Sequence, residues 1–216
     1  MKNGPRLSAW LLSAALAISP AAAGIGVNVD VLWHPNPKDD SQVFLHLSNM
    51  AYPAPRVEVV EVFHQISNPY ETYPTLAFIA HYGHVSIGTV WEYKKKGHDW
   101  YNVMMHFGVQ PSVLFFEVPQ QPGPPYGKAY GHWRKHGNRL KPDMINNDDV
   151  RYWVNLRTVS MSSGVPPAEA VKWQQSGKKF EQLAGTKYRE KHGRGPELQE
   201  AGFGPGKGKG KGKGGN

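Results

Sequence analysis

Apolar residues recur every three or four positions along much of the chain, which is the spacing of amphipathic helices. Phe44, Leu47 and Ala51 share one face of such a helix. Pro53 and Pro55 then force a turn before the next helical segment. The pattern predicts a mainly α fold.

Two short segments follow a different pattern and predict a small two-stranded β element. From residue 25 to 33, apolar residues alternate with polar or small ones, which is the period of a strand with one buried face. The segment 113–118 is rich in β-forming residues and ends at Pro119, so we expect it to be the partner strand. Donation of the leading strand to a neighbouring subunit is the alternative.

Two helical blocks resemble each other across a separation of 80 residues. Residue type and spacing agree at seven pairs of positions. These pairs are Leu76 and Leu156, Ile79 and Val159, Val85 and Val165, Val90 and Ala170, Gly97 and Gly177, Trp100 and Phe180, and Val103 and Leu183. We therefore predict a duplicated three-helix unit, built as helical hairpins, over about 75–107 and about 155–187.

The first block also contains a motif that resembles the helix-turn-helix of DNA-binding proteins. Residues 79–90 read IAHYGHVSIGTV, and the family pattern has Ile-Ala, three spacers, Gly-Val-Ser and a later Thr-Val. Glycine lies one place early, at Gly83, with His84 in its expected place, whereas the second block has Gly164. The resemblance implies that 86–96 would be the reading helix. Its side chains suit base edges poorly, so nucleic-acid binding is an alternative and not our main prediction.

The first residues predict a cleavable signal peptide over 1–23. Lys2 and Arg6 precede an apolar stretch that is too short to span a bilayer, and small side chains lead to Ala23. No later segment is long and apolar enough to stop transfer, and the chain has no cysteine. We expect a periplasmic or secreted protein in which 24–193 forms one mainly helical domain.

The net charge of +8 at pH 7 is concentrated at the two ends of the chain. Without Lys2 and Arg6 the charge falls to +6, and without four lysines of the tail it falls to +2. The glycine-rich segment 194–216 is predicted to be disordered. It acts either as an electrostatic tether to anionic polymers or as a solubilising end. The tail lysines are Lys207, Lys209, Lys211 and Lys213.

The segment 119–142 combines prolines, glycines and aromatic residues and is predicted to be an irregular loop. Aromatic faces beside cations suit sugars, nucleotides or a partner peptide, through stacking and cation–π contacts. The alternative is that the rings anchor the loop to the core. The candidate ligand-binding residues are Tyr126, Lys128, Tyr130, His132, Trp133, Arg134 and Lys135.

Two pairs of histidines are weak candidates for metal binding: His81 with His84, and His132 with His136. Each pair shares a helical face if its segment is helical, but neither has a carboxylate at the spacing of a known metal motif. We therefore expect structural histidines, no metal and no cofactor. The sequence also shows no catalytic set, because Asp148 and its neighbour are best explained as the charged start of a helix.

The sequence PGPPYGKAYG at 122–131 is followed by HWRK and, later, by the Gly-Lys tail. Together these resemble a group of uncharacterised exported bacterial proteins, over the loop, its flanking helices and the tail. The resemblance implies export and no particular activity. We expect an exported, non-catalytic envelope protein with a binding or structural role, whose partners are anionic envelope polymers or another envelope protein. A nucleic-acid-binding protein and a hydrolase of envelope polymers are the alternatives.

Overall fold

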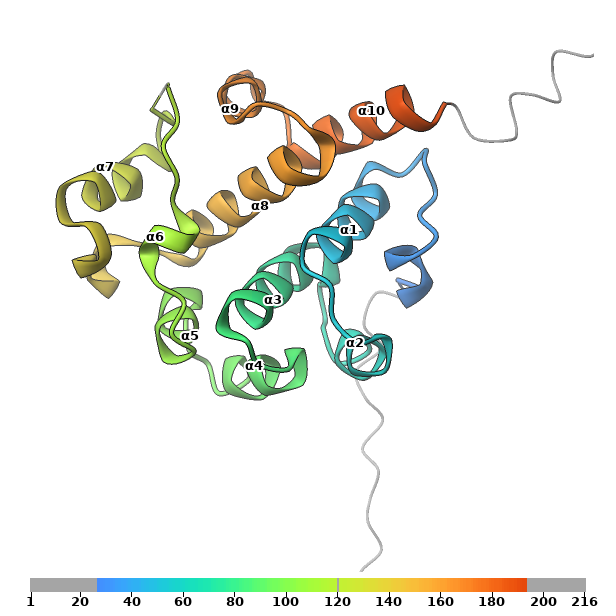
Figure 1. The fold of residues 1–216 in the computed structure, drawn as a ribbon, viewed down its shortest axis with the longest axis horizontal. Helices are drawn as coiled ribbons and strands as arrows, with labels where there is room; N and C mark the ends of the chain where they lie inside the picture. The colour runs from blue at the N-terminus through green and yellow to red at the C-terminus, as the bar shows by residue number, and fades with distance from the viewer. Residues whose placement is uncertain (1–26, 120, 194–216) are drawn as a thin grey trace, which may run out of the picture.

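Helices account for all the regular structure in the computed structural model, which describes residues 27–119 and 121–193. The prediction of a mainly α fold is confirmed for this part of the chain. Four long helices form its centre: α1 (Asp40–Ala51), α3 (Pro69–Gly83), α8 (Asn147–Ser163) and α10 (Phe180–His192). Helix α1 packs against α3, α8 and α10, and α3 packs against α8 (Figure 1).

Shorter elements surround these four helices in the described ranges. They are the helices α2 (Arg56–Phe63), α4 (Ile87–Lys94), α5 (Trp100–His106), α6 (Pro111–Leu114), α7 (Gly127–His136) and α9 (Pro167–Gln175), and the 3-10 helices η1 (Val29–Leu32), η2 (Gly137–Arg139) and η3 (Pro142–Met144). Figure 1 shows α2, α4 and α5 on one side of the central helices and α9 on the other. No helix in the described ranges is long and apolar enough to cross a membrane.

Polar side chains explain where α8 begins. The side-chain oxygen of Asn146 accepts a hydrogen bond from the backbone N–H of Asp149 at 2.9 Å, and the Asp149 carboxylate accepts one from the backbone N–H of Asn146 at 3.0 Å. This reciprocal pair satisfies two N–H groups that have no partner inside the helix. Asp148 also lies in the first turn, so this turn is acidic, as the sequence indicated.

Helices α3 to α5 and helices α8 to α10 form two three-helix units, which we name the first unit and the second unit. His84 ends α3 with φ of +52°, and Gly164 ends α8 with φ of +66°. Gly97 and Gly177, between the second and third helices, also have positive φ values, of +92° and +82°. The left-handed residues of the two units are therefore 80 positions apart, as are the apolar pairs read from the sequence. That one unit arose by duplication of the other stays a prediction.

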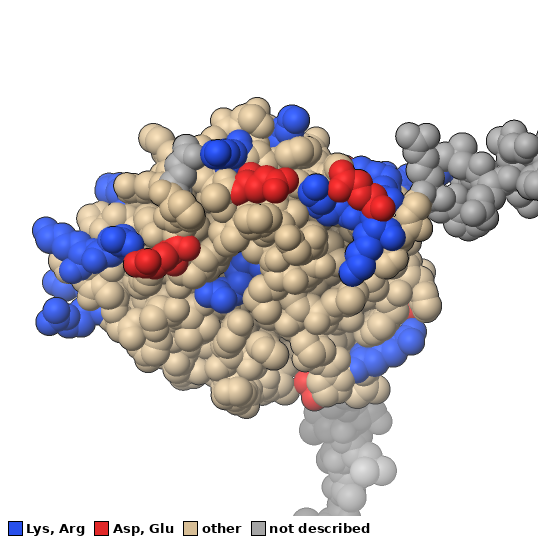
Figure 2. Space-filling model, turned by 45° about the horizontal axis from the view of Figure 1, so that its top comes forward, with Lys and Arg blue, Asp and Glu red and all other residues tan. Residues whose placement is uncertain are grey.

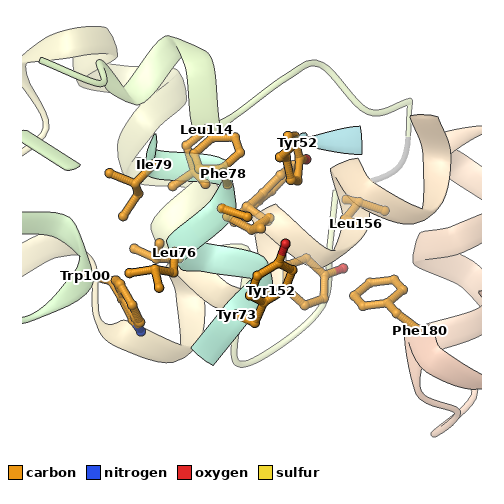
Figure 3. Close-up of a cluster of buried hydrophobic side chains, with 14 of the residues drawn as sticks. Tyr52, Tyr73, Leu76, Phe78, Ile79, Trp100, Leu114, Tyr152, Leu156 and Phe180 are labelled. Carbon is orange, nitrogen blue, oxygen red and sulfur yellow. The ribbon is translucent and has the colours of Figure 1, made fainter. Parts of the chain in front are cut away.

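Large buried side chains fill the contact between α3 and α8. Tyr73 and Trp153 occupy equivalent positions of the two units, and both side chains are completely buried. Figure 3 shows Leu76, Ile79 and Leu156 among the aromatic rings that surround these helices. The two units thus share one hydrophobic cluster.

The predicted two-stranded β element is wrong for the described residues. The first segment forms η1, in which the side-chain oxygen of Asn28 accepts a hydrogen bond from the backbone N–H of Asp30 at 2.9 Å. The second segment starts inside α6, which begins at Pro111, and continues as an irregular stretch. Helix α1 covers η1, so its apolar residues are buried without pairing to a second strand.

The prediction of an irregular loop over 119–142 is also wrong in part, because it contains α7, η2 and η3. Three prolines of this segment lie just before α7, at 122–125, where the Pro124–Pro125 peptide bond is cis, and Pro142 begins η3. The last turn of α7 is basic, which favours the helix dipole. Gly137 then ends the helix with φ of +57°. The predicted signal peptide and tail lie outside the described residues.

Candidate functional site

A cleft of about 340 Å³ lies where the starts of α3 and α8 meet the connection between α9 and α10. We name it the aromatic cleft. One of the predicted ligand-binding residues, Tyr126, lines it. The other lining residues are Tyr70, Glu71, Asp148, Arg151, Tyr152, Asn155, Gln174, Gly177, Lys178, Lys179, Phe180 and Glu181.

Stacked aromatic rings form one wall of the aromatic cleft. The ring of Tyr126 lies parallel to that of Tyr152, with centroids 4.1 Å apart and an angle of 15° between the planes. Tyr152 in turn contacts Phe180, with centroids 5.2 Å apart. Tyr152 is buried and Tyr126 is half-buried, so Tyr126 offers the accessible ring and Tyr152 supports it from behind.

The hydroxyl of Tyr152 is buried and has no hydrogen-bond partner among the described residues. Burial raises the pKa of Tyr152, and the neighbouring Tyr126 raises it further. The group therefore stays protonated at neutral pH and can donate a hydrogen bond. A buried hydroxyl without a partner costs about 1–3 kcal/mol, so a ligand atom that reached it would recover part of this cost.

Charged groups around the aromatic cleft compensate one another. Arg151 bridges the two units, because it pairs with Glu71 of α3 at 2.9 Å and also with Asp148 of α8. Lys178 lies over the ring of Trp173, at 4.3 Å from the ring centroid. The lining has equal numbers of acidic and basic side chains, so it has no net charge.

Tyr130 and Trp133 lie outside the aromatic cleft and pack into the core. Tyr130 is buried and stacks on Trp153, with centroids 4.9 Å apart. Trp133 stacks on Phe115, with centroids 5.3 Å apart. The faces of these two rings are used to anchor α7, which is the alternative that the sequence left open.

The polar candidates on α7 are dispersed over its outer surface. Arg134 pairs with Glu117 at 2.8 Å. Lys128 and Lys135 are exposed, and His132 is half-buried. None of these four lines the aromatic cleft. The tail lysines Lys207, Lys209, Lys211 and Lys213 lie outside the described residues.

The structure does not bring the candidate histidines into a metal site. The rings of His132 and His136 have centroids 6.4 Å apart. His81 and His84 are exposed at the end of α3. In the part of the chain that the structure describes, no group of three or more His, Asp or Glu side chains is placed to hold a metal ion.

The lysines near the predicted reading helix, now α4, are in contact with the protein itself. Lys94 donates a hydrogen bond to the carbonyl of His98 at 2.7 Å, Lys95 pairs with Glu92, and Lys96 lies over the ring of Tyr93. Helix α4 packs against α2 as well as α3 and α5. On the face shown in Figure 2, basic side chains gather mainly toward the two ends of the molecule, with acidic groups among them. These contacts do not favour a surface for the phosphate backbone.

Sequence reasoning missed most of the aromatic cleft. Asp148, Arg151, Tyr152 and Asn155 follow the spacing of one helical face, which is the signal that could have identified these four lining residues. Glu71 could not have been added to them without knowing that α3 lies beside α8. Comparison with protein-family models, with curated proteins and with solved structures gave no match.

Proposed function

We propose that this protein is an exported, non-catalytic binding protein of the cell envelope that holds an uncharged saccharide in the aromatic cleft. The stacked pair of Tyr126 and Tyr152 carries the proposal. It provides a flat and accessible ring in a concave site, with the unpartnered Tyr152 hydroxyl beside it. Binding sites are commonly concave, with aromatic walls and a few polar groups that fix the orientation of the ligand.

The chemistry of a sugar matches this lining. A pyranose has an apolar face of C–H groups that packs on an aromatic ring, and hydroxyls at its edge that need donors and acceptors. Glu71, Arg151 and Asn155 supply both around Tyr126. Because the charges of the lining cancel, the site suits a neutral ligand better than a polyanion.

The export part of the proposal depends on the predicted signal peptide at 1–23. In this proposal the basic tail supplies a separate, weaker attraction to anionic envelope polymers, which salt should reduce. A variant without 194–216 should lose that attraction and keep the saccharide affinity. Detection of the unprocessed chain in the cytosol would contradict export.

The binding part is tested by titrating the mature protein with neutral oligosaccharides, including soluble peptidoglycan fragments, and following tyrosine and tryptophan fluorescence or NMR shifts. Tyr126→Ala should weaken binding about three- to tenfold, since ring contacts contribute about 1 kcal/mol. Tyr188→Ala is the matched control, because Tyr188 is half-buried on α10, outside the aromatic cleft. Equal affinity for Tyr126→Ala and wild type, or no binding of any saccharide, would contradict the proposal. Release of shortened products would show that the protein is a hydrolase.

A further inference from the structure

Two hollows on the surface are lined by equivalent positions of the two units. The first hollow, of about 230 Å³, is lined on α3 and α4 by Ala77, Ala80, His81, His84, Val85, Ser86 and Ile87. The second hollow, of about 410 Å³, is lined on α8 and α9 by Arg157, Ser160, Met161, Gly164, Val165, Pro166 and Pro167. Each residue of the second set lies 80 positions after its counterpart in the first. The two hollows are therefore the same feature of the three-helix unit.

The chain itself covers one side of the first hollow. Pro53, Ala54 and Pro55, which connect α1 to α2, line it together with Glu58 of α2. Helix α2 packs on α4 and holds this segment in place. One carboxylate oxygen of Glu58, Oε2, is buried there without a hydrogen-bond partner among the described residues. The cover of the first hollow is thus a short segment with small apolar residues and one carboxylate.

The second hollow has no such cover in the described part of the chain. Phe116 is its only lining residue from outside the second unit. The side chain of Met161 is 53% exposed. Helix α9 packs on α8 and α10, and within 27–119 and 121–193 no helix packs on it as α2 packs on α4 in the first unit.

The second hollow differs from the first at two positions, where apolar side chains are replaced by hydrogen-bond donors that could bind a carboxylate. Ala77 and Ala80 of the first hollow are replaced by Arg157 and Ser160. Arg157 has no ion pair among the described residues and lies over the ring of Phe116, 4.8 Å from its centroid. Its Nε and the Ser160 hydroxyl are buried without hydrogen-bond partners there. A half-buried guanidinium without an acid is a binding group for a carboxylate.

We propose that the second hollow is a docking site for a short acidic segment of a partner protein. Small apolar residues of that segment would cover Phe116, Met161 and Val165, and its carboxylate would pair with Arg157. The first hollow shows that this unit accepts such a segment. The site shares no lining residue with the aromatic cleft, so it goes beyond the saccharide-binding proposal and stands or falls independently.

The test uses a fluorescein-labelled synthetic peptide with the sequence of residues 52–65, because this segment contains the residues that cover the equivalent hollow. Its binding to the full mature chain is measured by fluorescence anisotropy, beside a matched peptide that carries Glu58→Gln. We expect weak, saturable binding with a Kd on the order of 0.1–1 mM. Arg157→Ala in the protein, or Glu58→Gln in the peptide, should weaken it about tenfold, and combining both should add little.

Arg139→Ala is the control for a lost positive charge, since Arg139 is exposed on η2 and does not line the second hollow. It should leave peptide binding unchanged, and circular dichroism should show that every variant is folded. Arg157→Lys should bind with intermediate affinity. Absence of saturable binding, or equal affinities for Arg157→Ala and wild type, would overturn the proposal. Displacement of the peptide by N-acetylglutamate at an equal concentration would also overturn it, in favour of a site for small carboxylates.

Discussion

Glu71 and Arg151 occupy equivalent positions of the two units, 80 residues apart, and form an ion pair with each other at 2.9 Å. Equivalent positions meet only near an axis that relates two units, so the starts of α3 and α8 lie beside such an axis. The aromatic cleft opens at the same place. A ligand there contacts both units, as ligands often do where two similar halves of a protein meet.

The Glu71 and Arg151 pair should contribute little to stability by itself. Both side chains are partly exposed, and Arg151 keeps Asp148 as a second partner. A double-mutant cycle with Glu71→Ala and Arg151→Ala should give a coupling energy of about 0.5 kcal/mol, decreasing as salt is added. Urea unfolding of the four proteins measures it. A coupling above about 2 kcal/mol would show that the pair is a main contact between the units.

The first helix of each unit ends at a residue in the left-handed conformation, and the identity of this residue should affect stability. Gly164 adopts this conformation without steric cost, whereas His84 has a Cβ that disfavours it. His84→Gly should raise the free energy of unfolding by about 1 kcal/mol, and Gly164→His should lower it by a similar amount. His81→Gly is the control, because an exposed glycine within a helix should destabilise by about 1 kcal/mol. A destabilised His84→Gly protein would mean that the imidazole has a contact that outweighs the strain.

Two glycines of α7 should respond oppositely to alanine. A Cβ on Gly127 would collide with the backbone carbonyl of Pro122, which cannot move aside without displacing the chain. Gly127→Ala should therefore lower the melting temperature clearly, with a loss of about 3 kcal/mol. A Cβ on Gly131 would meet only the side-chain nitrogen of Gln121, at 3.7 Å, so Gly131→Ala should stabilise by about 0.5–1 kcal/mol. Equal changes in melting temperature for the two variants would argue against the position of α7 beside Pro122.

Burial makes stability dependent on alkaline pH through three tyrosines. It raises the pKa of Tyr52, Tyr73 and Tyr152 above the ordinary value of 10. A raised pKa in the folded state means that the full stability is present below pH 10 and is lost as the pH rises above it, because the unfolded chain ionises first. We expect the urea midpoint to fall steeply from about pH 10 upward.

Phenylalanine variants separate these tyrosines. Tyr152→Phe removes a buried hydroxyl without a partner, so at neutral pH it should raise the free energy of unfolding by about 1–3 kcal/mol. Tyr73→Phe removes a hydrogen bond to the buried Asn49 side chain at 2.7 Å and should cost about 1–2 kcal/mol. Both variants should unfold at a higher pH, relative to their neutral stability, than wild type. If the pH of alkaline unfolding is the same in both variants as in wild type, these tyrosines are not the cause of the alkaline loss of stability.

The sequence was sufficient for the long helices because their apolar residues repeat with the helical period and their ends carry clear signals. In the structure Pro166 directly precedes α9, and Gly177 follows it with a positive φ. The β prediction failed because η1 buries Val29, Val31 and the adjacent Leu32 together. Alternation over a few residues therefore did not indicate a single buried face. Burial of a short segment from several directions leaves no periodicity to read.

The site was harder to predict than the fold. Tyr126 was found from local composition, but the same criterion selected Tyr130 and Trp133, whose rings are used in packing. What separates these residues is which ring faces the core, and that depends on the position of α7 against α8. The equivalence of the two hollows follows from the repeat of 80 residues. That the chain covers the first hollow and not the second could not be predicted without knowing where α2 packs.

Helix α10 is the last helix of the described chain, yet it is a main packing partner of α1, near the beginning. Arg189 bonds to Asp40 at 2.6 Å and to the carbonyl of Pro37 at 3.0 Å. A nascent chain that still lacks α10 leaves exposed the part of α1 that α10 covers. Folding of this domain to completion therefore has to wait until the chain has been made as far as α10. Such a delay keeps the growing chain unfolded for longer, which is what the proposed export would require of it.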